Sequence, residues 1–187
     1  MADEKFHPEE ILKLEFEYAS RTAEQAQDDR TAIVNLYLFL VGGVGSVIGA
    51  LIQWRGVDEL RLVFSFALAL LGVIGFFMVF KLIRLRQSWH DSALTMNRIK
   101  DFYLERFPEL AQAFRWRTET IPAEGKWWTI SFNLAVLVAV IDSMALSIAV
   151  HLAEIHFGLV ELAVEILVGF AFLVFQIWFY HFQLPKS

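Results

Sequence analysis

The chain has 187 residues, and it contains no cysteine and only 4 prolines. The lack of cysteine excludes a disulfide framework, a thiolate metal site and a cysteine nucleophile. Other enzyme signatures are missing as well, because no serine lies in a Gly-x-Ser-x-Gly setting and no Gly-x-Gly-x-x-Gly or Gly-Lys-Ser/Thr motif occurs. We therefore expect a protein that is not an enzyme and that has no cofactor and no metal site.

Positive charge is scarce too. The net charge is −5, and the lack of a basic tail or a basic-aromatic patch argues against a nucleic-acid partner. The first 17 residues are acidic and do not resemble a signal peptide, so we expect the first apolar run to act as an uncleaved anchor. A lipid anchor is not expected either, since residue 2 is Ala2 and there is no cysteine to acylate.

What the chain has in excess is apolar residues, which make up 57% of it, with 18 Phe and 6 Trp. A soluble domain usually has about 45–50%. The excess is concentrated in four runs of roughly the length that crosses a hydrocarbon core. These runs are Ile33–Gln53, Leu62–Ile83, Ile130–Leu152 and Leu159–Tyr180.

Short links join the first two runs (Trp54–Arg61) and the last two (Ala153–Gly158), and links of this length predict antiparallel hairpins. The predicted fold class is therefore all-α: a polytopic membrane protein with four transmembrane helices in two antiparallel hairpins, plus cytosolic amphipathic helices. The corresponding segments are a cytosolic N-terminal helix (1–32), a first hairpin (33–83), a cytosolic helical connection (84–128), a second hairpin (129–180) and a cytosolic tail (181–187).

Both cytosolic segments carry apolar stripes at helical spacing. Ile11, Leu14 and Tyr18 form one on a helix predicted over residues 8–31. A second runs from Leu82 to Tyr103, so the second membrane helix is expected to continue into the cytosol until Pro108 interrupts it. This second stripe either packs against helix 8–31 or forms a stalk through which protomers assemble.

Basic residues indicate the orientation. Of the 16 Lys and Arg, 14 lie in the N-terminal segment, the central connection with its flanks or the C-terminal tail, and only Arg55 and Arg61 lie in the short turns. The positive-inside rule then places both termini in the cytoplasm. We expect a multi-pass protein of a bacterial inner or plasma membrane, in contact with the lipid bilayer.

The first run is rich in small residues. Gly42, Gly45, Ser46 and Gly49 have the small-xxx-small spacing of a helix-packing face. Such a face makes close contact inside one bundle, lines a narrow polar path or forms a subunit interface. A homo-oligomer is expected, because four short spans enclose little space alone.

Asp142 is an isolated acid near the middle of the third run, and no Lys or Arg occurs between Lys126 and Lys186. An ionisable group at that depth costs several kcal/mol unless it is paired, protonated or hydrated. At a rise of about 1.5 Å per residue, Asp142 lies roughly 12 Å below Val150, and Glu165 of the fourth run lies roughly 9 Å below Leu159. We therefore expect the two carboxyl groups to face each other.

The fourth run extends this acidic pattern into a stripe that holds Gly158, Glu161, Glu165, Gly169 and Gln176. Glu161 is expected just above Glu165, and Glu154 at the outer mouth. The predicted ion or proton pathway, or partner contact, therefore consists of Asp142, Glu165, Glu161 and Glu154. His151 and His156 flank Glu154, and we interpret them as an exposed polar turn and not as a metal or pH-sensing cluster.

Two close carboxylates cannot both be ionised cheaply. The alternatives are a shared proton, a bound cation, a hydrated cavity, a basic residue from a partner chain, or a protonated carboxyl with a structural role only. The leading function is a proton or cation pathway or a triggered pore. The alternative is a non-transporting anchor or assembly subunit whose acids engage a partner membrane protein.

Two stretches carry a resemblance in overall plan. Glu15–Arg30 leads directly into the Gly-rich run, and Arg84–Phe107 leaves the second run. In this plan the chain resembles small bacterial multi-span membrane proteins, including the two-span membrane effectors of antiviral systems. Met96–Tyr103 also looks like part of a bacterial family of unassigned activity. The resemblance implies a defence effector opened by a trigger, with a cytosolic sensor as partner, and it assigns no individual site residues.

Overall fold

The computed structural model describes residues 8–55, 58–123, 125–158 and 162–184. It has four long helices, α1 (Pro8–Arg55), α2 (Arg61–Arg106), α3 (Ile130–Phe157) and α4 (Leu162–Gln183). Two short 3-10 helices, η1 (Pro108–Gln112) and η2 (Thr118–Thr120), lie between α2 and α3. Each long helix is long and apolar enough to cross a membrane. The all-α fold class is therefore confirmed for the described residues, which contain no strand.

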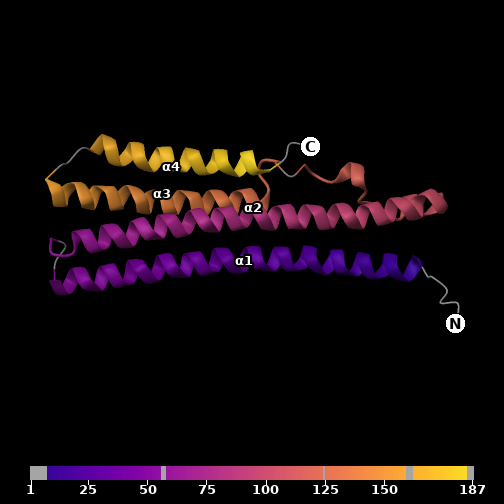
Figure 1. The fold of residues 1–187 in the computed structure, drawn as a ribbon, viewed down its shortest axis with the longest axis horizontal. Helices are drawn as coiled ribbons and strands as arrows, with labels where there is room; N and C mark the ends of the chain where they lie inside the picture. The colour runs from indigo at the N-terminus through magenta and orange to yellow at the C-terminus, as the bar shows by residue number, and fades with distance from the viewer. Residues whose placement is uncertain (1–7, 56–57, 124, 159–161, 185–187) are drawn as a thin grey trace, which may run out of the picture.

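The helices lie side by side in the order α1, α2, α3, α4 (Figure 1). The contact between α2 and α3 is the most extensive, followed by those of α1 with α2 and of α3 with α4. At the end that holds the N-terminus, α1 and α2 extend well past the other two helices, and the opposite end holds both helix-to-helix turns (Figure 1). We call the extension, residues 8–30 and 84–106, the stalk, and the opposite end the turn end.

The part of the bundle beyond the stalk turns large apolar side chains outward and small ones inward. Phe39, Phe66 and Phe170 are 77%, 74% and 63% exposed. Alanines and serines of α3, such as Ala139 and Ser143, are buried against the other helices. Lipid tails are as apolar as Phe, so helix contacts in a membrane depend on the close approach that small residues permit. This pattern supports a protein embedded in a membrane.

Both α1 and α2 extend far beyond the predicted apolar runs, for one physical reason. No glycine or proline occurs between Pro8 and Gly42, so nothing interrupts the helix at the expected boundary near residue 32, and α1 is continuous. The predicted continuation of the second run is confirmed, because α2 ends at Arg106, directly before Phe107 and Pro108. Each of α1 and α2 is therefore one continuous helix that contains both a predicted membrane segment and a part of the stalk.

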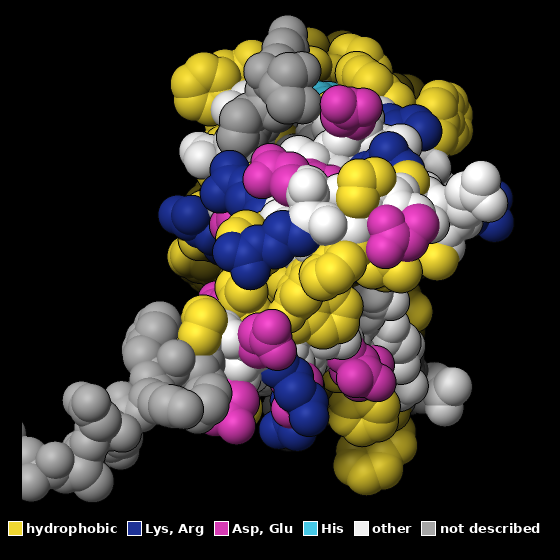
Figure 2. Space-filling view, turned by 90° about the vertical axis from the view of Figure 1, so that its right-hand side faces the viewer, with side chains coloured by type: hydrophobic (Ala, Val, Ile, Leu, Met, Phe, Trp, Pro, Cys, Tyr) yellow, Lys and Arg dark blue, Asp and Glu magenta, His cyan; other side chains and the backbone are white. Residues whose placement is uncertain are grey.

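In the stalk, α1 packs on α2 through alanines, which we expected only to extend the predicted stripe, and not through the larger residues of that stripe. Ala19, Ala23 and Ala26 are buried, whereas Ile11, Leu14 and Tyr18 point away and are exposed. Small alanines let the two helix axes approach closely, and the larger apolar residues are left on the outside. Seen from the stalk end, the surface carries charged side chains of both signs among apolar ones (Figure 2).

The predicted stripe of α2 is covered partly by the segment that follows the helix. Trp89, Ala93 and Met96 line a groove with Trp116, Ile121 and Pro122. Arg86 fixes this segment, because its Nη2 donates a 3.3 Å hydrogen bond to the carbonyl oxygen of Ala123. Much of this stripe thus packs against other residues of the same chain.

Candidate functional site

Asp142 lies in the middle of α3 and has no exposed surface. Gln176 of α4, which is also unexposed, donates a 2.9 Å hydrogen bond from Nε2 to Asp142 Oδ1. The same nitrogen lies 3.4 Å from Ser143 Oγ. A neutral amide therefore partners this carboxyl group, in place of the Lys or Arg that both helices lack.

The carboxyl group fits at this position because α2 has a glycine opposite it. A Cβ atom added at Gly75 would overlap with the Asp142 side chain, lying 2.8 Å from its Cγ. Gly72, one turn away, also faces α3, but a Cβ there would lie 3.4 Å from the backbone oxygen of Asp142, which is ordinary van der Waals contact. The second carboxyl oxygen, Oδ2, is buried and has no hydrogen-bond partner within the described residues. Of the two carboxyl oxygens, Oδ1 thus accepts a hydrogen bond from Gln176, and Oδ2 has no hydrogen-bond partner among the described residues.

Tyr37 adds a residue of α1, the remaining long helix, to this site. It is fully buried on α1, in the same core cluster as Val138 and Ala139, which lie one turn before Asp142 on α3. Its hydroxyl also has no hydrogen-bond partner in the described part of the chain. Asp142 is therefore enclosed by groups from α1, α2 and α4, and it is not open to lipid.

Glu165 has a different partner from the one expected. Its Oε1 lies 2.5 Å from Nδ1 of His151, which is nine residues from Asp142 and so about 13 Å away along α3. The expected pairing of Asp142 with Glu165 is corrected to two separate pairs, Asp142 with Gln176 and Glu165 with His151.

The cause of this difference is the length of α3. The prediction placed the end of the third span near Val150, whereas α3 continues to Phe157 and ends at Gly158, which has a φ of 72°. The level of α4 that faces Asp142 is therefore at Gln176, about three turns deeper than Glu165. His151 and Glu154, expected in or beside an outer turn, belong to the helix as well.

A line of polar groups follows the contact between α3 and α4. Ser147 Oγ donates a 2.7 Å hydrogen bond to the backbone oxygen of Glu165. Gly169 permits this approach, because a Cβ there would lie 3.0 Å from Ser147 Cβ. We define the α3–α4 polar file as His151, Glu165, Ser147, Ser143, Gln176 and Asp142.

The polar file runs from a half-exposed group to a buried one. The side chain of His151 is 42% exposed, and that of Glu165 is 10% exposed. Gln176 and Asp142, at the other end, are unexposed. His151 is therefore more exposed than Glu165, its partner in the file.

The other predicted site residues have different outcomes. Glu154 is half-buried on α3, one turn beyond His151, and its side chain is not without an interaction partner. Glu161 lies outside the described residues. No group of three His, Asp or Glu side chains in the described part of the chain could hold a metal ion.

The predicted packing face of α1 has no partner among the described residues. Gly42, Gly45, Ser46 and Gly49 are exposed, and a Cβ at any of the three glycines would meet nothing within 4 Å. The contact inside one bundle is therefore not made by this face, and its use as a subunit interface stays a prediction. Ser46 uses its hydroxyl locally, donating a 2.8 Å hydrogen bond to the backbone oxygen of Gly42.

Several site residues were not singled out from the sequence. Ser143 and Ser147 were not noted, although with His151 they recur every four residues and so share one face of α3. His151 was named, but only as part of an exposed polar turn. Gln176 was part of the predicted stripe, but without a role. Gly75 and Tyr37 carried no comparable signal, because their importance depends on how α1 and α2 align with α3.

Comparison of the chain with protein-family models, with curated proteins and with solved structures finds no match.

Proposed function

We propose that the protein is an integral membrane protein that passes protons, and that Asp142 is the proton-binding group in its path. The observation that carries this proposal is the partial satisfaction of Asp142, which is fully buried, bonded through Oδ1 to a neutral amide, and unpartnered at Oδ2. A buried ionised carboxylate without a counter-charge is costly, and protonation removes that cost. The group is thus suited to bind a proton and to release it when its surroundings change.

The space around the site favours protons over larger cations. The cavity beside Gln176 has a volume of about 10 Å³, which is the least that holds one water molecule. A metal cation needs several oxygen ligands or its own water shell. Asp142 offers one unpartnered oxygen, so a hydrated cation has neither the room nor the ligands.

The α3–α4 polar file supplies the route from the turn end. Protons would enter at His151 and Glu165 and reach Asp142 past the hydroxyls of Ser147 and Ser143. Neighbouring hydroxyls on one helix face are a turn apart, so waters would have to complete the connection between them. We infer that the stalk side is cytoplasmic, because 14 of the 16 Lys and Arg lie on that side.

The alternative function, an assembly subunit whose acids engage a partner, has less support. Asp142 has no exposed surface, and Glu165 is buried and bonded to His151. A basic residue of a partner chain could reach neither acid without separating α3 from α4. Assembly of several copies and the triggered defence role stay predictions.

Proton flux in liposomes tests the proposal. We expect purified protein to dissipate a pH gradient under a valinomycin-induced potential faster than protein-free liposomes do, as read from an internal pH-sensitive dye. Asp142→Asn should reduce this flux to the protein-free rate, because an amide in that position cannot give up a proton to the path.

Asp58→Asn is the matched control, since Asp58 is an exposed acid of the turn between α1 and α2 that pairs with Arg61. It should conduct like the wild type. The proposal would be refuted if the wild-type protein never exceeded the proton flux of protein-free liposomes. It would also be refuted if the Asp142→Asn variant conducted protons like the wild type.

A further inference from the structure

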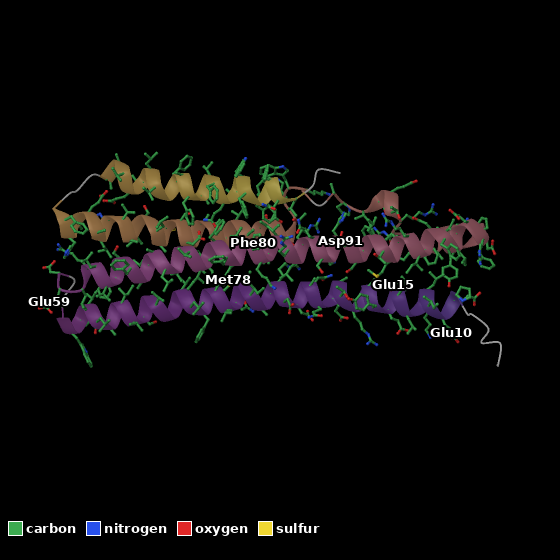
Figure 3. The ribbon with its side chains drawn as sticks, viewed as in Figure 1. Glu10, Glu15, Glu59, Met78, Phe80 and Asp91 are labelled. Atoms are coloured by element: carbon green, nitrogen blue, oxygen red, sulfur yellow. The ribbon has the colours of Figure 1, made fainter. Side chains whose placement is uncertain are left out.

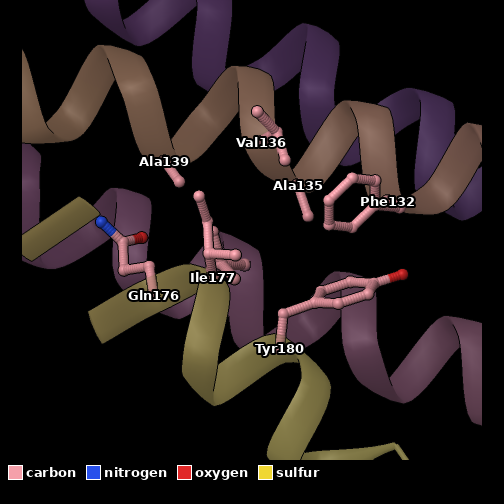
Figure 4. A pocket seen from close by; sticks show the side chains of 8 residues that line it. Phe132, Ala135, Val136, Ala139, Gln176, Ile177 and Tyr180 are labelled. Carbon is pink, nitrogen blue, oxygen red and sulfur yellow. The ribbon is translucent and has the colours of Figure 1, made fainter. Parts of the chain in front are cut away.

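The polar file stops at Gln176, and a small cavity lies directly beyond it. The cavity is lined by Val79, Phe132, Ala135, Val136, Ala139, Gln176, Ile177 and Tyr180. Figure 4 shows Gln176 at one end of this group and the rings of Phe132 and Tyr180 at the other. Ala139, on the wall, is one helical turn from Asp142 towards the stalk.

Gln176 has an unused hydrogen-bonding group at this cavity. Its Nε2 is bonded to Asp142, whereas its Oε1 is buried and has no partner in the described residues. An unpaired buried amide oxygen carries a desolvation cost, which a water molecule in the cavity would relieve. Such waters usually make two to four hydrogen bonds, so one held mainly by Gln176 would be present only part of the time.

The far end of the cavity is closed by packed aromatic rings. The ring centroids of Phe132 and Tyr180 lie 5.6 Å apart in an edge-to-face arrangement. Trp127 packs on the other side of this pair, 5.3 Å from Phe132 and stacked at 3.9 Å on His181. We call Trp127, Phe132, Tyr180 and His181 the aromatic plug.

Polar groups resume on the stalk side of the plug. Ser131, next to Phe132, accepts a 3.0 Å hydrogen bond from Arg30 Nη1. The stretch between Gln176 and this side is therefore the cavity and the aromatic plug, in which the Tyr180 hydroxyl and the His181 imidazole are buried among packed rings. A proton that has reached Asp142 meets its main obstacle there.

We propose that Phe132 and Tyr180 form a gate between Asp142 and the stalk side of the membrane, and that one water molecule bound at Gln176 Oε1 carries the proton up to this gate. The inference rests on the proposed proton path through Asp142. When the rings separate, the Asp142 carboxyl group gives its proton to this water, and the resulting hydronium gives a proton to a water molecule on the stalk side of the gate. The carboxylate left behind is then protonated again from the polar file.

Opening the gate by mutation is the first test. Phe132→Ala removes the ring and enlarges the cavity, so more water enters and the liposome proton flux should rise severalfold above that of the wild type. Phe132→Leu should give a smaller rise. The increase should disappear in the double variant Phe132→Ala/Asp142→Asn, which separates a gate in this path from a general leak.

Phe170→Ala is the matched control, because Phe170 is an aromatic residue of α4 that is 63% exposed and does not line the cavity. It should leave the flux unchanged. If the wild type conducts through Asp142 but Phe132→Ala conducts no faster, the gate is wrong and the proton path stands.

A second measurement tests the gate without any flux. The chain has no cysteine, so Ala139→Cys introduces a single thiol on the cavity wall. In nanodiscs, a small methanethiosulfonate reagent should modify it slowly with Phe132 present and much faster after Phe132→Ala, but not after Phe170→Ala. Equal rates in all three backgrounds would overturn the gate, even if no variant conducts.

Discussion

At the scale of single residues, Asp142 and Gly75 act as one unit. The acid is accommodated in the bundle because the helix opposite has no side chain at the point of contact. The small residue and the carboxyl group must therefore be aligned by the register between α2 and α3. Gln176 then supplies the only hydrogen bond to Oδ1 from another helix that the described structure contains.

Gly75→Ala should destabilise the protein by about 1–3 kcal/mol, because the added methyl group overlaps with the Asp142 side chain and forces the helices apart. Unfolding by titration with a denaturing detergent, followed by circular dichroism, measures the effect. Gly42→Ala is the control, since a Cβ there meets nothing within 4 Å, and it should be neutral or slightly stabilising. Equal losses for both variants would contradict the close contact.

The sequence was informative about one member of this unit and not about the other. Asp142 could be recognised because an isolated acid in an apolar run has a high free-energy cost in a membrane and so indicates a specific role. Gly75 is one of two glycines in its run, and the three glycines of α1 that share the predicted packing face meet open space. Spacing on one helix shows which residues share a face, but not which helix that face meets.

At the scale of helices, the register between α3 and α4 determines which polar groups meet. Gly158 ends α3 with a left-handed backbone conformation, and its N–H bonds back to the oxygens of Glu154 and Ile155. The predicted contact of Asp142 with Glu165 was wrong because the helix was expected to end a turn or more earlier. Apolar content marks where a membrane segment lies, whereas the end of the helix depends on its cap.

Gly158→Val should destabilise this pair of helices by about 1–2 kcal/mol, because a residue with a β-branched side chain is strained at positive φ. The same detergent titration measures the change. Gly45→Val is a suitable comparison, since it adds the same side chain to a helix interior with open space around it, and it should have a smaller effect. A larger loss at Gly45 would show that Gly158 does not require its conformation.

At the scale of the whole molecule, the two ends differ in charge and shape. The stalk holds two long helices with the connecting segment beside them, whereas at the turn end α1 and α3 end and α2 and α4 begin (Figure 1). Figure 3 shows Glu10 at the stalk end and Glu59 at the turn end. The number of membrane-crossing helices followed from apolar run length, but the sidedness rests on the distribution of basic residues alone.

Cysteine labelling of intact cells checks the sidedness. Glu59→Cys should react with a membrane-impermeant maleimide from outside, because the turn end is expected to face away from the cytoplasm. Glu10→Cys should react only after the cells are permeabilised. The unmodified protein is a clean background, since it has no cysteine. The opposite pattern would reverse the proposed orientation and, with it, the direction in which protons enter the polar file.

The continuity of α2 has a mechanical consequence. No proline interrupts it between Gly75 and Arg106, so the tip of the stalk and the contact with Asp142 belong to one stiff rod about 46 Å long. A rod without a joint works as a lever. Several ångström of sideways movement at the tip correspond to a tilt of a few degrees at Gly75, and a small force applied in the water exerts a large torque on the packing around a carboxyl group deep in the membrane.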